Sequence, residues 1–156
     1  MSLTHPAILI SLGLISAALL YAAVVGTAKP EVPVETRQAI AALGMELPKL
    51  RHPTRQHWVS GQPTLGQLSQ LKARGITRVI NLRPAAEVPE LKEAEHLHAI
   101  GLSYRELPIT GDADLILANA QKLDALLAES GEDSTLLHCA SGNRVGALMS
   151  LRAAWI

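Results

Sequence analysis

LLHCASGNRVGALM, residues 136–149, joins an apolar run, a lone cysteine, a loop with a glycine and an arginine, and a second apolar run. A short apolar run that ends at a turn is typical of a buried strand, and the residues from Arg144 onward favour a helix. Cys139 therefore stands where a predicted strand gives way to a predicted helix. Its thiol could attack phosphate, carry sulfur or fill space in a core.

Strand and helix patterns alternate on the N-terminal side of this stretch. Segments with the apolar and β-branched pattern of buried strands are Val59 with its neighbours, 76–82, 102–107 and 135–138. Segments with helical spacing or helix start and stop signals are 64–74, which begins with a capping box, 89–99, 114–129, and 144 onward. This order predicts an α/β fold with a mainly parallel central sheet flanked by helices.

The predicted fold gives Cys139 a chemical role. In such sheets ligands bind at the carboxyl ends of the strands, which is where Cys139 falls. A helix N-terminus and backbone N–H groups of a loop stabilise a thiolate at this position. The same N–H groups can hold a tetrahedral oxyanion, while the guanidinium of Arg144 binds two of its oxygens and Gly142 gives the loop its backbone freedom. These features favour a reactive thiol over a structural cysteine.

The composition excludes several classes of function. The chain has 156 residues, of which 48% are hydrophobic, and its 14 basic side chains balance 14 acidic ones. A net charge near zero and the absence of Phe argue against a nucleic-acid partner, which would need basic surface or stacking platforms. The single cysteine excludes an internal disulfide and a zinc site of several thiolates. We expect no cofactor and no metal.

An uncharged apolar segment occupies residues 7–28. As a helix it is long enough to cross a hydrocarbon core of about 30 Å. We predict that residues 1–28 are a transmembrane anchor or a signal peptide. The small residues at 26–28 suit signal peptidase, whereas the region before the apolar run lacks the Lys or Arg of a signal peptide.

Residues 29–57 are predicted to be a linker with a short helix. A helical pattern at 35–45 lies between KPEVPVE and LPKLRHPTRQH, two segments rich in proline and in charged or histidine side chains. The folded domain is then expected over residues 58–156. The last predicted helix reaches Ile156 without a Gly, Asn or Pro stop signal, as a domain truncated at its C-terminus would.

HCASGNR resembles the HC-x-x-G-x-x-R signature of protein tyrosine and dual-specificity phosphatases. His138, Cys139, Gly142 and Arg144 stand in the signature roles. The loop departs from the signature because four residues, not five, separate the cysteine from the arginine. Val145 also replaces the Ser or Thr that usually follows the arginine in those phosphatases.

Two further motifs narrow the resemblance. With SGQPT at 60–64 and VINLR at 79–83, the loop is similar to a bacterial phosphatase-like family that also occurs as a domain beside beta-lactamase-fold hydrolases. The resemblance covers residues 58–156 and implies the fold of cysteine-dependent phosphatases. The shortened C-x4-R spacing also resembles that of rhodanese sulfurtransferases.

The resemblance implies hydrolysis of phosphate monoesters through a phosphocysteine intermediate, without a metal. Cys139 would be the nucleophile, and the general acid would be Asp112, in the loop before the long helix. Asp112 is equally readable as a turn former, and Asp114 stands where it would cap that helix. The substrate's phosphate would bind to Ala140, Ser141, Gly142, Asn143, Arg144 and Arg83.

Other polar residues have supporting or structural interpretations. Asn81 ends a predicted strand and could line the pocket, as could Arg83. His138 is expected to orient the loop through a hydrogen bond. His96 and His98 lie two apart on a predicted helix and do not share a face, so no metal site is expected there.

Three functions remain open at this point. The first is a cysteine-dependent phosphatase acting on a phosphorylated small molecule or a phosphoprotein. The second is a rhodanese-like sulfurtransferase with a persulfide on Cys139, and the third is a noncatalytic anion-binding module. We expect the protein to be membrane-anchored or exported, at a bacterial inner membrane or in a periplasm, with the side of the membrane open.

Overall fold

The structure is a computed structural model that describes residues 33–156. The strands are β1 (His57–Ser60), β2 (Ile76–Asn81), β3 (Ser103–Glu106) and β4 (Ser134–His138). The α-helices are α2 (Val34–Leu43), α3 (Leu65–Leu68), α4 (Glu93–Ala99), α5 (Leu117–Ala128) and α6 (Asn143–Trp155). Short 3-10 helices are η1 (Lys72–Arg74), η2 (Ala85–Glu87) and η3 (Asp112–Asp114).

The segment predicted as an anchor or signal peptide, residues 7–28, lies outside the described residues. Within residues 33–156, no helix has both the length and the apolar character needed to cross a bilayer. The anchor therefore stays a prediction from the sequence.

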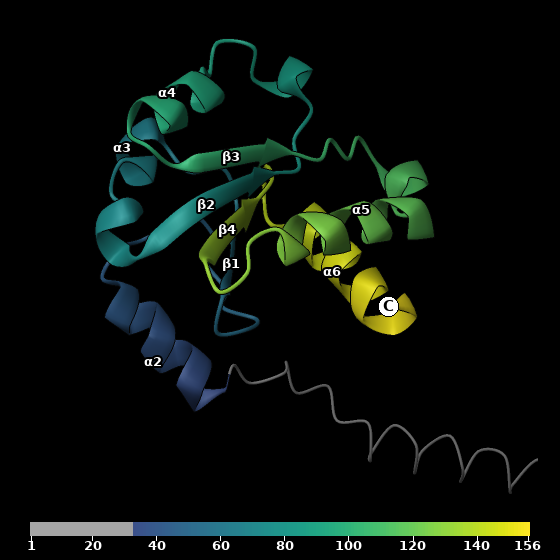
Figure 1. Ribbon diagram of the computed structural model, residues 1–156, viewed down its shortest axis with the longest axis horizontal. Helices are drawn as coiled ribbons and strands as arrows, with labels where there is room; N and C mark the ends of the chain where they lie inside the picture. The colour runs from purple at the N-terminus through teal and green to yellow at the C-terminus, as the bar shows by residue number, and fades with distance from the viewer. Residues whose placement is uncertain (1–32) are drawn as a thin grey trace, which may run out of the picture. The chain divides into compact units, whose positions relative to one another are not determined.

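All four strands run parallel, in the order β1-β4-β2-β3 (Figure 1). The central strand β4 pairs with β1 and β2, so that His138 lies opposite Ser60 on one side and Asn81 on the other. The prediction of an α/β fold with a parallel sheet flanked by helices is confirmed. Three strands thus end at the same level, immediately before Cys139.

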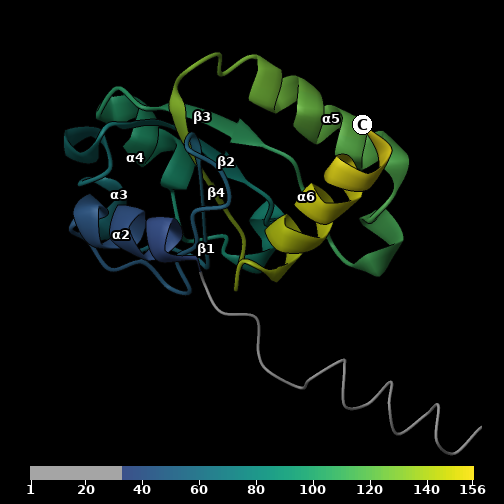
Figure 2. The same ribbon diagram turned by 90° about the horizontal axis from the view of Figure 1, so that it is seen from below.

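The strands are apolar at consecutive positions because both faces of the sheet are covered. Leu136 and Leu137 are both fully buried but belong to different core clusters, since neighbouring strand residues point to opposite faces. Figure 2 shows α5 and α6 on one side of the sheet and α2, α3 and α4 on the other. A slip of β4 by one residue would move each of these leucines into the core cluster on the other face, where different neighbours are packed.

Cys139 belongs to the core cluster on the side of α5 and α6. Val145 and Leu148 anchor α6 in this cluster, and both are fully buried. The loop between Cys139 and α6 is therefore fixed at both ends, by β4 on one side and by α6 on the other. A loop held in this way needs little reorganisation to bind a ligand.

The segment predicted as a linker with a short helix differs from the expectation. Leu43, at the end of α2, and Leu47 are only 7% exposed and join the core cluster on the side of α3 and α4. Arg51 also forms an antiparallel bridge with Val59. Residues 33–57 pack as part of the folded unit, because apolar residues four positions apart are buried despite the prolines and charges around them.

Helix boundaries shift by a few residues from the predicted ones. The capping box of Thr64 and Gln67 is present, but the expected helix over 64–74 divides into α3 and η1. The long helix begins at Leu117 instead of Asp114, with Ile116 as its N-cap and no side-chain cap. The carboxylate of Asp114 accepts hydrogen bonds from Thr110 instead, so the expected cap is wrong.

Candidate active site

The loop after β4 surrounds the thiol of Cys139 with backbone N–H groups. The side chain of Cys139 is 1% exposed, and the backbone nitrogen of Gly142 donates to its Sγ over 3.1 Å. Burial raises the pKa of Cys139, but the backbone N–H groups of Val145, Ser141, Arg144 and Gly142 together outweigh it and lower the pKa below its ordinary value. These donors lie at the N-terminus of α6, where the helix dipole also favours a negative charge.

Close backbone contacts hold this loop against the end of β1. Gly142 has a φ of 82°, and a Cβ there would lie 3.3 Å from the carbonyl oxygen of Ser60. A Cβ on Gly61 would lie 3.0 Å from the carbonyl oxygen of Ala140. The backbone nitrogen of Gln62 donates to that same oxygen over 3.3 Å. The first residues of the SGQPT motif therefore support the cysteine loop.

The guanidinium of Arg144 forms a two-point ion pair with Glu87. Its Nη1 and Nη2 donate to the two carboxylate oxygens over 2.6 and 2.8 Å, and Nη1 also donates to the carbonyl oxygen of Ile109 over 2.8 Å. The hydrogen bond from Arg144, together with one from Arg83 and against a contribution from burial, lowers the pKa of Glu87 to about 2. The ion pair is therefore charged throughout the neutral range.

Arg83 lies in the same network. Its Nε donates to Glu87 over 3.0 Å, and its Nη1 donates to Oε1 of Gln62 over 2.9 Å. Its backbone nitrogen donates to Oδ1 of Asn81 over 2.8 Å. Asn81 and Arg83, predicted to line a pocket, are thus linked to Arg144 through the carboxylate of Glu87.

His138 points away from the Cys139 cluster, as alternation along β4 requires. It is fully buried, and its Nε2 lies 2.6 Å from Oε1 of Glu93, which is 3% exposed. Its backbone oxygen accepts from the nitrogen of Leu82 over 2.8 Å. These contacts fix the residue immediately before the cysteine, and the orienting role of His138 stays a prediction.

The two aspartates of the loop before α5 have different surroundings. The carboxylate of Asp114 accepts from the backbone nitrogen and hydroxyl of Thr110, and these hydrogen bonds lower its pKa. Asp112 begins η3 and is exposed. The loop also supplies Ile109, whose carbonyl oxygen accepts from Arg144. Of the two carboxylates, Asp112 is the one whose oxygens are not occupied in closing the turn.

Comparison with known proteins shows what this chain is similar to. A Beta-lactamase hydrolase-like protein of Xylella fastidiosa is 35% identical over 97 residues, which cover 60% of this chain and 22% of that protein. The matched part of the chain thus spans less than a quarter of the length of the curated relatives it matches. No protein-family model matches the chain.

Solved structures share the fold. A proposed phosphatase (DUF442) from Shewanella putrefaciens CN-32 is 25% identical, with a TM-score of 0.63 over 72% of this chain and 74% of that one. By fold and by loop, this domain is protein-tyrosine-phosphatase-like. The catalytic domain of the PP-IP phosphatase SIW14 from S. cerevisiae, 18% identical with a TM-score of 0.57, covers 67% of this chain and 65% of its own and shows the same fold. The neighbours support a cysteine-based phosphatase in general.

The other residues predicted to bind phosphate or to be structural have the following surroundings. Ala140 and Asn143 are exposed, and Ser141 is partly buried. His96 and His98 are separated in their contacts, because His96 bonds to Ser69 while His98 packs edge-on against Tyr104. Among residues 33–156 no group of three or more His, Cys, Asp or Glu side chains could hold a metal ion.

Several polar residues around the loop were not predicted. Glu87, Gln62 and Glu93 have no motif of their own in the interpretation of the sequence, yet each contacts a predicted site residue. Gln62 does lie within SGQPT, so the motif pointed to its place but not to its contacts. Glu87 carries no such signal, because a charged residue in a loop is ordinarily solvated.

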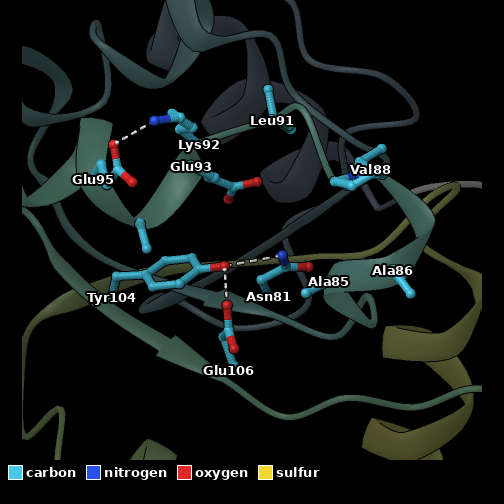
Figure 3. A pocket seen from close by; sticks show the side chains of 12 residues that line it. Asn81, Ala85, Ala86, Val88, Leu91, Lys92, Glu93, Glu95, Tyr104 and Glu106 are labelled. Atoms are coloured by element: carbon cyan, nitrogen blue, oxygen red, sulfur yellow. Dashed lines mark hydrogen bonds and ion pairs between the residues drawn. The ribbon is translucent and has the colours of Figure 1, made fainter.

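A cavity of about 430 Å³ lies at the edge of the sheet, beside β3 and α4 (Figure 3). Figure 3 shows the Tyr104 hydroxyl between Asn81 and Glu106, with Glu93 nearby. Neither Cys139 nor Arg144 lines this cavity. The donors that lower the thiol pKa therefore lie at the cysteine loop and not in this cavity.

Proposed function

We propose that the phosphatase-like domain hydrolyses phosphate monoesters through a phosphocysteine intermediate. The observation that carries this proposal is the buried Cys139 thiol, whose pKa is lowered by backbone N–H groups of a loop that ends at Arg144. A thiolate among donors that also suit a tetrahedral oxyanion is prepared for nucleophilic attack on phosphorus.

In the first step the Cys139 thiolate attacks phosphorus in line with the leaving oxygen. The new S–P bond forms as the bond from phosphorus to the alcohol or phenol oxygen breaks, and Asp112 gives its proton to that oxygen. In the second step the Asp112 carboxylate takes a proton from a water molecule as that water attacks phosphorus; the S–P bond breaks, and the thiolate, inorganic phosphate and protonated Asp112 are formed. Val145 places no hydroxyl beside the sulfur, so the backbone N–H groups stabilise the leaving thiolate.

The contacts of Arg144 leave one edge of its guanidinium for the substrate. Three of its five N–H groups point to Glu87 and to the carbonyl oxygen of Ile109. The other two, on Nε and Nη2, form the side-on pair that binds two oxygens of a phosphate. Glu87 therefore holds the guanidinium by its end, and we assign it a positioning role in phosphate binding.

We expect Glu87→Gln to lower kcat/KM about tenfold, because the neutral amide holds the guanidinium less firmly and presents only one acceptor oxygen. Steady-state rates with an aryl phosphate would measure the change. Glu90→Gln, an exposed substitution in the same loop, is the matched control and should retain wild-type kcat/KM. Equal rates for both variants would remove Glu87 from the proposed site.

Asp112→Asn should lower kcat with an aryl phosphate of poor leaving group by about 100-fold, the usual effect of losing a general acid. The loss should be smaller with an aryl phosphate of good leaving group, because a good leaving group needs no proton to depart. Rates with the two substrates, measured beside Asp133→Asn as an exposed control, test both effects. Equal rates for Asp112→Asn and the wild type with the poor leaving group would contradict the assignment of Asp112.

Sulfur transfer is the second candidate, favoured by the four-residue spacing between Cys139 and Arg144. The full chain, purified in mild detergent because of its apolar segment, would be assayed with an aryl phosphate and separately with thiosulfate plus cyanide. Phosphate release supports the phosphatase. Thiocyanate formation without phosphate release would support the sulfurtransferase, and binding of an oxyanion without either reaction would support a noncatalytic module.

The proposal also covers the substrate of the domain and the location of the protein in the cell. We propose a phosphorylated small molecule or a phosphoprotein as the substrate, and attachment to a bacterial inner membrane, or export, through residues 7–28. The length of that segment and its lack of charge support this part. Membrane fractionation of cells that express the full chain or a chain lacking residues 1–28 would test it.

A further inference from the structure

A chain of buried and half-buried polar groups begins behind the cysteine. The ring of His138, the residue before Cys139, lies 2.6 Å from Oε1 of Glu93. The second carboxylate oxygen of Glu93 accepts from Nε2 of Gln62 over 3.0 Å. Because His138 and Glu93 are almost fully buried, water cannot replace these contacts.

The same chain continues to the arginine at the other end of the loop. The side-chain oxygen of Gln62 accepts from Arg83 over 2.9 Å. Arg83 donates a hydrogen bond to Glu87 over 3.0 Å, and Glu87 accepts hydrogen bonds from both terminal nitrogens of Arg144. One continuous series of side-chain contacts thus joins the residue before the nucleophile to the last residue of the loop.

Gln62 stands at the centre of this series, between the carboxylate of Glu93 and the guanidinium of Arg83. Its NH2 group donates to the Glu93 carboxylate while its oxygen accepts from the Arg83 guanidinium. A side-chain amide has both a donor and an acceptor, whereas a carboxylate would repel Glu93 and an ammonium would repel Arg83. The position therefore requires the chemistry of an amide.

We propose that Gln62 is a positioning residue that couples the two ends of the Cys139–Arg144 loop. It fixes Arg83 and, through Glu87, the direction of the Arg144 guanidinium, while Glu93 ties the same network to His138. The inference rests on the proposed oxyanion site. It adds that the affinity of the site for a tetrahedral oxyanion depends on a side chain that need not touch the anion.

The test is a double-mutant cycle on the full chain, with tungstate as a tetrahedral oxyanion probe and calorimetry as the measurement. We expect Gln62→Leu and Glu87→Gln each to weaken tungstate binding about tenfold. The double variant should bind about as weakly as either single variant, because each change breaks the same series. A purely structural effect of Gln62 would instead add to that of Glu87.

Two further variants keep the test decisive. Gln121→Leu, exposed on α5, is the matched control and should bind tungstate as the wild type does. Gln62→Glu keeps the acceptor for Arg83 but loses the donor to Glu93, and we expect it to weaken binding while changing the shape of the side chain least. Additive effects in the cycle, or wild-type binding by both Gln62 variants, would overturn the coupling.

The outcome is independent of catalysis. Coupled loss of tungstate binding in a chain without phosphatase activity would uphold the inference and remove the proposed function. Normal phosphatase activity with additive effects on binding would do the reverse.

Discussion

Cys139→Ser should abolish phosphate release, with a fall in kcat on the order of 10⁵-fold or more, as expected when a nucleophile is removed. A serine hydroxyl is far less acidic than a thiol and remains protonated even in a loop whose N–H groups lower the pKa of the thiol. Initial rates with an aryl phosphate measure the loss. Acid quenching should trap labelled phosphate on the wild-type chain and none on the variant.

The control for this variant is oxyanion binding. Cys139→Ser keeps the backbone N–H groups and Arg144, so tungstate should still bind with affinity near that of the wild type. Loss of both activity and binding would mean that the loop has changed its shape. Activity at the wild-type level would exclude covalent catalysis by the thiol.

The lowered pKa of Cys139 also predicts a pH dependence. Because the thiolate is the reactive form, alkylation by iodoacetate should slow as the pH falls through the Cys139 pKa, which the backbone N–H groups lower. The midpoint should lie below that of the same thiol in the chain unfolded by denaturant. Since Cys139 is the chain's single cysteine, incorporation of the label reports on this thiol alone.

Arg144→Lys should lower kcat/KM by about 1,000-fold, although the positive charge is kept. A lysine ammonium cannot donate to both carboxylate oxygens of Glu87 and also present a side-on pair of donors to phosphate. The expected result is a rise in KM together with a fall in kcat, because the guanidinium contacts the substrate's oxygens in the ground state and in the transition state.

A matched control separates the effect of Arg144→Lys from the effect of replacing any arginine by lysine. Arg55→Lys is exposed and should leave kcat/KM at the wild-type level. Arg144→Lys should also weaken tungstate binding. If it retained both tungstate affinity and kcat/KM, the two-point recognition of phosphate by Arg144 would be contradicted.

Much of the fold follows from local patterns. The strands at 76–81, 103–106 and 134–138 were predicted within one residue at each end, because each is bounded by turn or helix signals and the first and last of them are largely buried. The capping box of Thr64 and Gln67 was predicted because it requires only two side chains three residues apart. Features encoded in short windows of sequence are accessible to this reasoning.

The sequence was less informative where local signals competed. Residues 33–57 have the prolines and charges of a linker, yet Leu43 and Leu47 are buried against α3 and α4. Asp114 had the position of a helix cap, but the nearby Thr110 took its carboxylate. In both cases a tertiary or loop contact outweighed the local preference.

The sequence by itself determined the parallel α/β sheet and placed Cys139 and Arg144 at either end of a loop at the carboxyl end of a strand. Only the tertiary structure decided what holds that loop. Gln62 follows β1 and both Glu87 and Glu93 follow β2, and these segments reach the loop after β4 because the three strands end at the same level. No periodicity encodes such a meeting, since the three segments are distant in sequence and their contacts exist only once the strands have paired.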